Sequence, residues 1–205
     1  GGFAWCYEGQ ETTKSDIYAI KVIPKNRLTK PHHREKVLRE ISLHERLKHK
    51  HVVLMHSSFE DNHNMYIVLE YCRLKSLLSV IKKRATVTEA EVRYYMRQLL
   101  MAVHYLHTSQ RVLHRDIKLG NILVTGDMQL KLADFGLASE MDENGRPPNI
   151  TICGTPNYIA PEVLQKQGHS VASEIWALGC TMYAMLVGKP PFETSNLEDT
   201  YSLIQ

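Results

Sequence analysis

Apolar residues are spaced as in β-strands through much of the first 70 positions. Residues 16–24 are rich in β-branched side chains and end at a proline, which predicts a strand. Residues 51–59 and 65–70 predict two further strands, joined by a polar turn. Residues 1–8 begin with two glycines, and on their own they fit a plain hairpin turn that leads into a strand. We therefore expect a small β-sheet near the N-terminus.

One helix is expected inside this strand-rich region. After a basic connector, apolar residues recur at helical spacing, at Val37, Leu38, Ile41 and Leu47. Glu40 lies on the same helix, at a different angular position from Ile41.

Helical patterns dominate after residue 70. A short helix is expected near residues 74–81, and the capping-box sequence Thr88-Glu89-Ala90-Glu91 opens a helix that is expected to end near His107. Residues 175–187 are apolar on nearly every side, which predicts a buried helix. In the helix that follows Thr88, spacings of three and four predict one buried stripe, formed by Val92, Met96, Leu99, Leu100, Val103 and Leu106.

The change from strands to helices predicts a domain boundary, with domains at residues 1–70 and 71–205. A chain of 205 residues is long enough for one large domain or for two small lobes around a cleft. Its hydrophobic content of 43% and charged content of 23% are ordinary for a globular protein. The net charge of +3 is too mild to indicate nucleic-acid binding, which usually needs a clustered basic face.

Cysteine usage and hydropathy exclude several other classes of protein. Cys6, Cys72, Cys153 and Cys180 are far apart and form no Cys-x-x-Cys pair, so neither a zinc site nor a disulfide framework is expected. Reduced thiols in an intracellular protein are the expectation. No apolar run approaches the roughly 20 residues of a membrane span, so no membrane partner is expected.

The strongest chemical signal is the segment from His114 to Asn121, followed by Asp134-Phe135-Gly136. Asp116, Lys118 and Asn121 place one base and two helpers in a single loop, and Asp134 adds a carboxylate for a divalent metal. This order and spacing are typical of the protein-kinase catalytic loop, which holds a hydroxyl, a triphosphate and Mg²⁺ in line. Either triplet alone is a weak signal, but the two together are specific.

A second signal is Lys21, which shares a strand face with Ala19. A lysine between apolar neighbours is usually a surface residue whose charged end reaches solvent. However, Ala19-Ile20-Lys21 also matches the strand whose lysine holds the α- and β-phosphates of ATP. Such a lysine needs a carboxylate partner. The spacing between this lysine and its partner in protein kinases favours Glu40 over Glu35 or Glu45. An ordinary surface ion pair is the alternative for Glu40.

With these motifs, and with Ala160-Pro161-Glu162, the chain resembles a eukaryotic protein kinase along nearly its whole length. More narrowly, it resembles the polo-like kinases. The segments that carry this narrower resemblance are Gly1-Gly2-Phe3-Ala4, residues 30–36 (KPHHREK), Leu119-Gly120-Asn121, residues 153–158 (CGTPNY) and residues 188–194 (GKPPFET).

The resemblance implies an α+β, two-lobed protein-kinase fold. Its N-lobe would be a small antiparallel sheet without its first strand, and its C-lobe would be mainly helical without its last helices. The implied activity is transfer of the γ-phosphoryl group of ATP to serine or threonine of protein substrates, with Mg²⁺, in cell-cycle or mitotic control. The implied location is the cytoplasm and nucleus, and the centrosome.

The resemblance also assigns roles to individual residues. Asp116 would accept the proton of the substrate hydroxyl, and Lys118 would stabilise the transferring phosphoryl group. Asn121 and Asp134 would bind Mg²⁺, and Lys21, with Glu40 behind it, would hold ATP. The other implied nucleotide contacts are Gly1, Gly2, Phe3 and Ala4 in the glycine-rich loop, Ala19, and Leu69, Glu70 and Cys72 in the adenine hinge.

Thr151 is implied as a regulatory phosphorylation site. Arg115 directly precedes Asp116, and kinases with this arginine are commonly controlled by a phosphate on the activation segment. Thr155 is the nearest competitor, but it resembles the threonine that contacts Asp116 and Lys118. Without the resemblance, Thr151 would be interpreted as an ordinary solvated loop residue.

Two positions depart from the family pattern. Ala4 stands where the general motif has its third glycine. Glu174 stands where family members usually carry an aspartate that braces the catalytic loop, so the longer side chain is expected to fit poorly. A polo-box region, which docks phosphorylated targets, is expected downstream in the full-length protein but is absent from this chain.

Two other functions are weighed against a kinase. A pseudokinase scaffold would keep the fold without turnover, and it is disfavoured because Lys21, Asp116, Asn121 and Asp134 are all present. A Rossmann dinucleotide enzyme is a distant third, since no Gly-x-Gly-x-x-Gly follows a strand and opens a helix.

Overall fold

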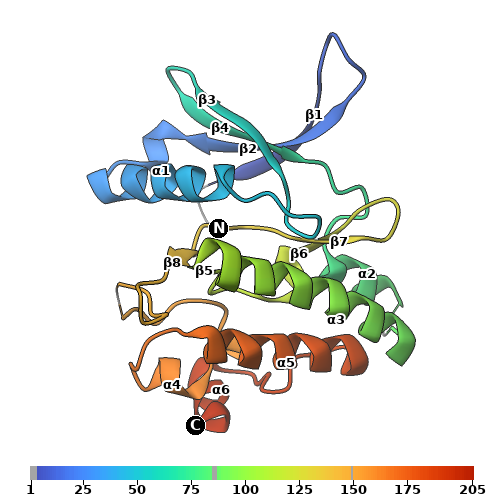
Figure 1. Cartoon of the computed structure of the whole chain (residues 1–205), viewed down its shortest axis with the longest axis vertical. Coiled ribbons are helices and arrows are strands. Elements are labelled where there is room, and N and C mark those ends of the chain that lie inside the picture. Colours follow the sequence, from blue (N-terminus) through green and yellow to red (C-terminus); the bar gives the residue numbers. More distant parts are fainter. Residues whose placement is uncertain (1–3, 85–86, 149) are drawn as a thin grey trace.

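A four-stranded antiparallel sheet stands at the N-terminal end of the structure, a computed structural model that describes residues 4–84, 87–148 and 150–205 (Figure 1). Gly1, Gly2 and Phe3, three of the predicted nucleotide contacts, lie outside the described residues. The sheet order is β1-β2-β4-β3. The strands are β1 (Trp5–Gln10), β2 (Ile17–Pro24), β3 (Met55–Glu60) and β4 (Asn64–Glu70).

The strand predicted at residues 51–59 begins only at Met55. The residues before it pair with a different part of the chain: Val53 N donates to Leu132 O at 2.9 Å, and Leu132 N donates to His51 O at 2.9 Å. Their backbone hydrogen bonds are satisfied there, so these residues join the two halves of the molecule instead of extending the sheet.

Helix α1 (Pro31–Glu45) packs beside the sheet and follows a short 3₁₀ turn at Lys25–Arg27. Pro31 occupies its first turn, where the missing N–H costs no hydrogen bond. Val37 and Ile41 pack against the buried sheet residues Ile23, Met55, Met65 and Ile67. Leu38, another apolar position of this helix, is 45% exposed, because it lies about 100° around the helix from Val37.

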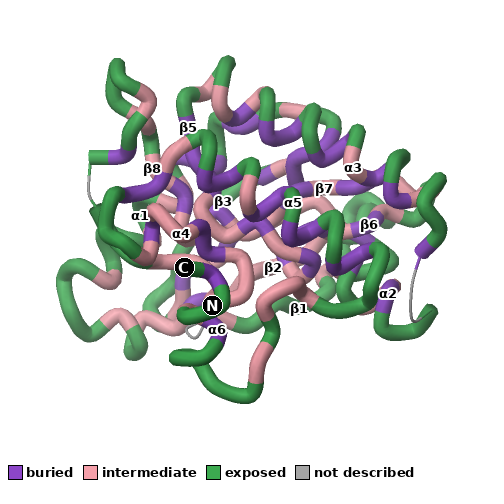
Figure 2. The backbone as a smooth tube through the Cα atoms, turned by 90° about the horizontal axis from the view of Figure 1, so that it is seen from below, coloured by how far each residue is buried: buried purple, intermediate pink, exposed green. Residues whose placement is uncertain are grey.

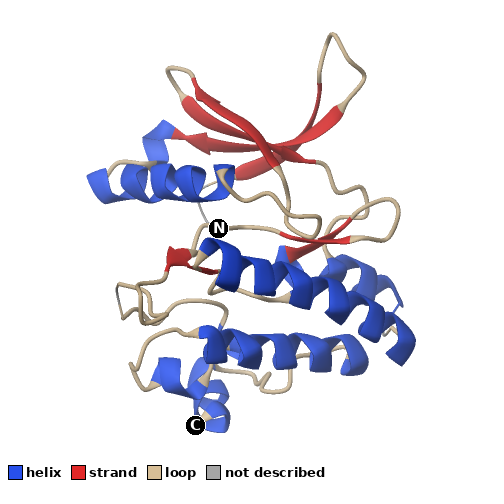
Figure 3. Cartoon of the chain, viewed as in Figure 1, coloured by secondary structure: helices blue, strands red, loops and turns tan. Residues whose placement is uncertain are grey.

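The second half of the chain is mainly helical, as Figure 3 shows. The capping box predicted at Thr88 is confirmed, since Thr88 Oγ1 accepts from Glu91 N and a Glu91 carboxylate oxygen accepts from Thr88 N. The helices are α2 (Leu77–Arg84), α3 (Glu89–His104) with a π-helical continuation at Tyr105–Gln110, α4 (Pro161–Leu164), α5 (Val171–Val187) and α6 (Leu197–Ile204).

Two helical predictions need correction. Leu100 was expected in the buried stripe of α3, but it is 47% exposed, whereas the next residue along that stripe, Val103, is buried. Helix α5 was expected to be buried on nearly every side, but Ile175 is 54% exposed. Helix α5 packs against α3 and the turn η4 (Pro156–Tyr158) through its other face, which carries Leu178 and Met185.

One large hydrophobic core connects the two halves. It combines the buried faces of α3 and α5 with Leu43, Leu47 and Val52 from the N-terminal part, so packing continues across residue 70. The purple stretches in Figure 2 run through the middle of the molecule accordingly. Among the described residues, no helix is long and apolar enough to cross a membrane.

Two short antiparallel strand pairs position the loops that carry the predicted chemistry. Strand β5 (Val112–Leu113) pairs with β8 (Ser139–Glu140), and β6 (Ile122–Val124) pairs with β7 (Leu130–Leu132). The segment between β5 and β6 contains Asp116, and the segment between β7 and β8 contains Asp134. Because both pairs are antiparallel, the two segments are held at the same junction below the sheet.

Candidate active site

Asp116 is the centre of a compact hydrogen-bond network. Its Oδ1 accepts from Thr155 Oγ1 at 2.7 Å, and its Oδ2 accepts from Asn121 Nδ2 at 2.8 Å. Lys118 Nζ lies 2.8 Å from Asp116 Oδ2 and donates to Thr155 Oγ1 at 2.6 Å. The structure thus brings Asp116, Lys118 and Asn121 together as predicted, and it adds Thr155 from the distant activation segment. The Lys118 ammonium and the hydrogen-bond donors of Asn121 and Thr155 thus surround the Asp116 carboxylate.

His114 fixes the backbone of this loop. The side chain is fully buried, its Nε2 lies 2.9 Å from Ala133 O, and its Nδ1 accepts from Asp116 N at 3.2 Å. A neutral imidazole with one donor and one acceptor satisfies both contacts, so Nε2 carries the proton. His114 therefore ties the Asp116 loop to the chain that leads into Asp134.

Two residues of the site have left-handed backbone conformations. Arg115 has φ 66° and Asp134 has φ 64°. Such values are uncommon for residues other than glycine and persist where the surroundings hold them, often at functional sites. For Arg115 the restraints are a 2.6 Å bond from its N–H to Glu174 Oε1 and a 2.6 Å bond from its Nε to Leu137 O.

Glu174 fits its position, contrary to the expectation that a longer side chain would fit poorly. It is 2% exposed, and its second oxygen, Oε2, lies 2.6 Å from His107 Nε2. Both carboxylate oxygens are thus hydrogen-bonded, which a buried carboxylate requires. His107, interpreted from the sequence as structural, is the partner that holds Glu174 against the catalytic loop.

Lys21 and Glu40 form the predicted pair. Lys21 Nζ lies 2.5 Å from Glu40 Oε1 and 3.7 Å from Asp134 Oδ1. Burial acts to lower the pKa of Lys21, but the Glu40 and Asp134 carboxylates outweigh it and raise the pKa above its usual value. Burial likewise acts to raise the pKa of Asp134, but Lys21 and other nearby positive groups hold it below its usual value. The ammonium and the carboxylate therefore both stay charged.

Asn121 and Asp134 are suited to Mg²⁺. Asn121 uses its amide N–H₂ for the Asp116 carbonyl and carboxylate, at 2.9 and 2.8 Å, so its amide oxygen takes no part in those bonds. Asp134 is ionised and its side chain is 37% exposed. Mg²⁺ is usually held by one or two carboxylates together with substrate phosphates, not by an all-protein cage. The described residues contain no group of three or more His, Cys, Asp or Glu that could hold a metal ion.

The predicted nucleotide contacts on the sheet lie side by side. Ala19 on β2 pairs with Leu69 on β4, and Ala4 and Leu69 both pack against the sheet core. Cys72 is buried, and burial raises the pKa of its thiol to about 12, so it is a neutral apolar residue.

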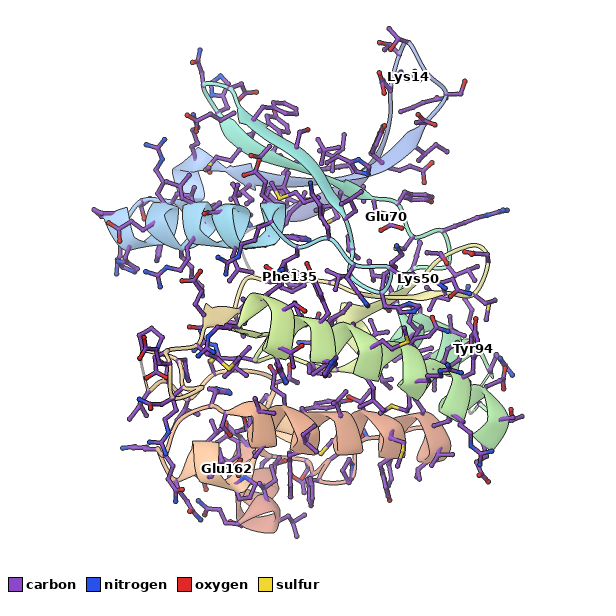
Figure 4. All side chains as sticks on the ribbon, viewed as in Figure 1. Lys14, Lys50, Glu70, Tyr94, Phe135 and Glu162 are labelled. Carbon is purple, nitrogen blue, oxygen red and sulfur yellow. The ribbon has the colours of Figure 1, made fainter. Side chains whose placement is uncertain are left out.

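Glu70 joins the sheet to the helical half, a role that the sequence did not indicate. Its Oε1 lies 2.7 Å from Lys131 Nζ on β7, and its Oε2 accepts from Leu54 N at 3.1 Å. Figure 4 shows Glu70 at this junction, and Phe135 between α1 and α3. The ring of Phe135 lies 4.6 Å from that of His44 and 5.1 Å from that of His114.

Comparison with known proteins agrees with this geometry. The family profile described as "Protein kinase domain" matches residues 1–205. The chain belongs to the protein kinase family. Members of this family generally use ATP and Mg²⁺, and kinases of this kind act on proteins.

Within the protein kinase family, the similarity is to polo-like kinases. The chain is 54% identical to serine/threonine-protein kinase PLK2 of Mus musculus, 51% identical to PLK1 of Xenopus tropicalis and 47% identical to polo of Drosophila melanogaster. Each alignment covers all of this chain but only 30%, 34% and 35% of the respective relative. The chain therefore spans about a third of the length of these curated relatives.

Proposed function

We propose that this chain transfers the γ-phosphoryl group of ATP to serine or threonine hydroxyls of proteins. The observation that carries the proposal is the Asp116 carboxylate, held at 2.7–2.8 Å by Thr155, Asn121 and Lys118. Beside it stands the Lys21–Glu40 pair, whose ammonium also lies 3.7 Å from Asp134. One half of the site suits a hydroxyl that must lose a proton, and the other half suits a triphosphate.

Asp116 is proposed as the base. In the complex, a substrate hydroxyl would take the place of one of the donors now bonded to the Asp116 carboxylate. It would pass its proton to that carboxylate oxygen as its own oxygen bonds to the γ-phosphorus, while the bond from the γ-phosphorus to the β–γ bridging oxygen breaks and ADP leaves. Lys118 lies between Asp116 and Thr155, where its ammonium would stabilise negative charge on the transferring phosphoryl oxygens. Because phosphoryl transfer needs little covalent chemistry, positioning and charge provide most of the catalysis.

Lys21 is proposed to hold the α- and β-phosphates. Glu40 keeps the ammonium in place through their 2.5 Å contact, and Asp134 lies close enough to share the same phosphate region. Asn121 and Asp134 would hold Mg²⁺, which when bound neutralises the phosphate oxygens and orients them. Ala19, Leu69 and the backbone near Cys72 would contact the adenine.

A pseudokinase scaffold is the alternative function. It would require that some part of the machinery be missing or misplaced. The described residues give no such signal, because Lys21, Asp116, Asn121 and Asp134 each have the partners described above. We therefore favour turnover.

The test is phosphorylation of a protein mixture by the chain with ATP and Mg²⁺, with sites mapped by mass spectrometry. Wild type should place phosphate on serine and threonine, whereas Lys21→Met and Asp116→Asn should not. Nucleotide binding without any transfer by wild type would support the scaffold instead. Phosphate on tyrosine alone would contradict the proposed substrate class.

We further propose that a phosphate on Thr151 activates the enzyme. Thr151 is exposed and lies two residues before Cys153. Burial has the largest effect on the pKa of both Cys153 and His169, and the positive charge of Arg115 acts to lower each pKa, so this cation lies near the segment that carries Thr151. A phosphate there would add about −1.5 to −2 charges and form one to three charge-assisted hydrogen bonds with such a cation. After treatment with an upstream kinase, wild type should be faster than Thr151→Ala. Equal rates would place the switch elsewhere.

The similarity to polo-like kinases supports a proposed role in cell-cycle control, with a polo-box region in the full-length protein. The sequence that flanks this chain in its gene would test for the polo-box region. Mitotic timing in cells with and without the protein would test the cell-cycle role. Normal division after complete loss would contradict the cell-cycle role.

A further inference from the structure

His169 is a buried histidine that the proposed chemistry does not use. It is 6% exposed and directly precedes Ser170, the N-cap of α5. Ser170 and Ser173 form a capping box, so the start of α5 is well ordered by its own hydrogen bonds. A side chain anchored at such a point is held more firmly than one on a loop.

The His169 ring contacts the activation segment. Its Nε2 lies 3.4 Å from Cys153 Sγ. Burial has the largest effect on the pKa of the ring and lowers it, whereas the backbone of Thr151 and Cys153 acts to raise it. The preceding Gly168 approaches the same stretch, because a Cβ on it would lie 3.6 Å from Ile150 Cγ1. Residues 150–153 of the activation segment therefore pack against Gly168 and His169, the two residues that precede the N-cap of α5.

Cys153, which His169 contacts, lies two residues before Thr155, which hydrogen-bonds to the proposed base Asp116. Gly154 passes so close to the catalytic loop that a Cβ on it would lie 2.8 Å from Arg115 O. Thr155 then donates to Asp116 Oδ1 at 2.7 Å. The position of Thr155 is therefore restrained by its two preceding residues, because Cys153 contacts His169 and Gly154 packs against the backbone of Arg115.

The same end of α5 also holds the catalytic loop. Glu174, one turn after Ser170, accepts from Arg115 N at 2.6 Å. His169, Cys153, Arg115, Asp116 and Glu174 together line a small cavity of about 20 Å³ between α5 and the two loops. The charged groups that face His169 are Arg115 and Glu174, and burial and Arg115 keep its pKa below the usual value, so the ring is neutral.

We propose that His169 is a positioning residue for phosphoryl transfer: it holds the activation segment at Cys153 and thereby sets Thr155 against Asp116. The inference rests on the proposed kinase activity for its kinetic consequence. The contact itself can be tested separately. Helix α5 would then fix both loops of the site from one rigid end, the catalytic loop through Glu174 and the activation segment through His169.

The test compares His169→Leu, His169→Asn and wild type. Leucine fills the space without hydrogen bonds, whereas asparagine keeps a donor and an acceptor. Because small misplacements of reacting groups are costly, His169→Leu should lower kcat about 10- to 100-fold, with the KM for ATP unchanged. His169→Asn should recover most of that loss. The matched control is His63→Leu, which changes an exposed histidine in the β3–β4 turn.

A second readout does not depend on activity. The alkylation rate of Cys153 by N-ethylmaleimide, followed by mass spectrometry, should rise in His169→Leu relative to that of the exposed Cys6 in the same molecule. Unchanged kcat together with unchanged Cys153 alkylation would overturn the inference. So would equal losses of kcat and melting temperature in the Leu and Asn variants, because that pattern indicates packing alone. If wild type transfers no phosphate, the proposed function fails, and the alkylation rates still decide whether His169 holds the segment.

Discussion

Lys21 carries its charge in a position where burial alone would favour the neutral amine. Glu40 and Asp134 reverse that preference, and the three groups form a small network with alternating charge. The network leaves Lys21 a strong donor toward the cleft. A variant that removes the ammonium must therefore be judged on both activity and stability, because it leaves two carboxylates without their cation.

We predict that Lys21→Met abolishes phosphoryl transfer and lowers stability by about 1–3 kcal/mol, since Glu40 loses the hydrogen bond of a charged donor. The double variant Lys21→Met with Glu40→Gln should regain part of the lost stability, because the unpaired charge of Glu40 is gone and only that of Asp134 remains, but it should stay inactive. Chemical denaturation and a transfer assay measure the two effects. If the double variant regained activity, Lys21 would not hold the phosphates.

Gly154 provides a second test that changes a single residue. It has φ +107°, and a Cβ there would lie 2.8 Å from Arg115 O, so Gly154→Ala should displace the activation segment and lower the transfer rate at least about tenfold. Gly145→Ala is the matched control, because Gly145 also has positive φ (+75°) but nothing within 4 Å of a Cβ. Equal rates in the two variants would show that the contact with Arg115 is unimportant.

Single elements explain which parts of the fold could be predicted from the sequence. The strand at 16–24 and the capped helix at Thr88 have strong local signals, and both are present. Leu100 was misplaced because periodicity gives the direction of an apolar stripe, whereas the edges of the stripe depend on what packs there. The exposed Ile175 shows the same limit for α5.

In the active site too, the residues marked by local sequence signals were predictable, whereas contacts between distant segments were not. Asp116, Lys118 and Asn121 were predictable because one loop carries all three, and Glu40 because family spacing marked it. The contacts of His107 with Glu174 and of His169 with Cys153 join elements 67 and 16 residues apart. No periodicity or spacing connects such pairs, so they could be found only from the structure.

Helix α5 offers a stability prediction. Gly179 lies inside this helix on its exposed side, and nothing lies within 4 Å of a Cβ built on it. Gly179→Ala should therefore stabilise the protein by about 0.5–1 kcal/mol, because alanine loses less backbone entropy in a helix. Urea denaturation measures the change. A destabilised variant would mean that α5 has a close neighbour at this position.

At the scale of the whole molecule, the sheet and the helical body are joined by contacts that include several histidines. His44 on α1 is 4% exposed, its Nε2 lies 2.8 Å from Val53 O, and its ring packs on Phe135. His51 Nδ1 lies 3.1 Å from Leu130 O across the same junction. Burial lowers the pKa of both, so the junction is built from neutral imidazoles.

This junction predicts a dependence of stability on pH. Burial lowers the pKa of His44 to about 4, below its usual value, so the unfolded chain takes up the proton first as the pH falls. The contribution of neutral His44 is complete above about pH 6.5 and is lost as the pH falls through 4, by up to about 3 kcal/mol. Denaturation of wild type between pH 7 and 4.5 should show this loss, and His44→Gln should show a shallower one. Parallel curves would contradict the assignment.

The most direct test of the central claim, that Asp116 is the base of a protein kinase, is the single-turnover rate of phosphoryl transfer at saturating ATP and Mg²⁺. Asp116→Asn should lower that rate about 10²- to 10⁴-fold, because an amide cannot accept the proton. Its affinity for ATP, measured by calorimetry, should stay close to that of wild type. Asp127→Asn, the same change at an exposed position, should have no effect on either. An Asp116→Asn rate equal to that of wild type would contradict the account.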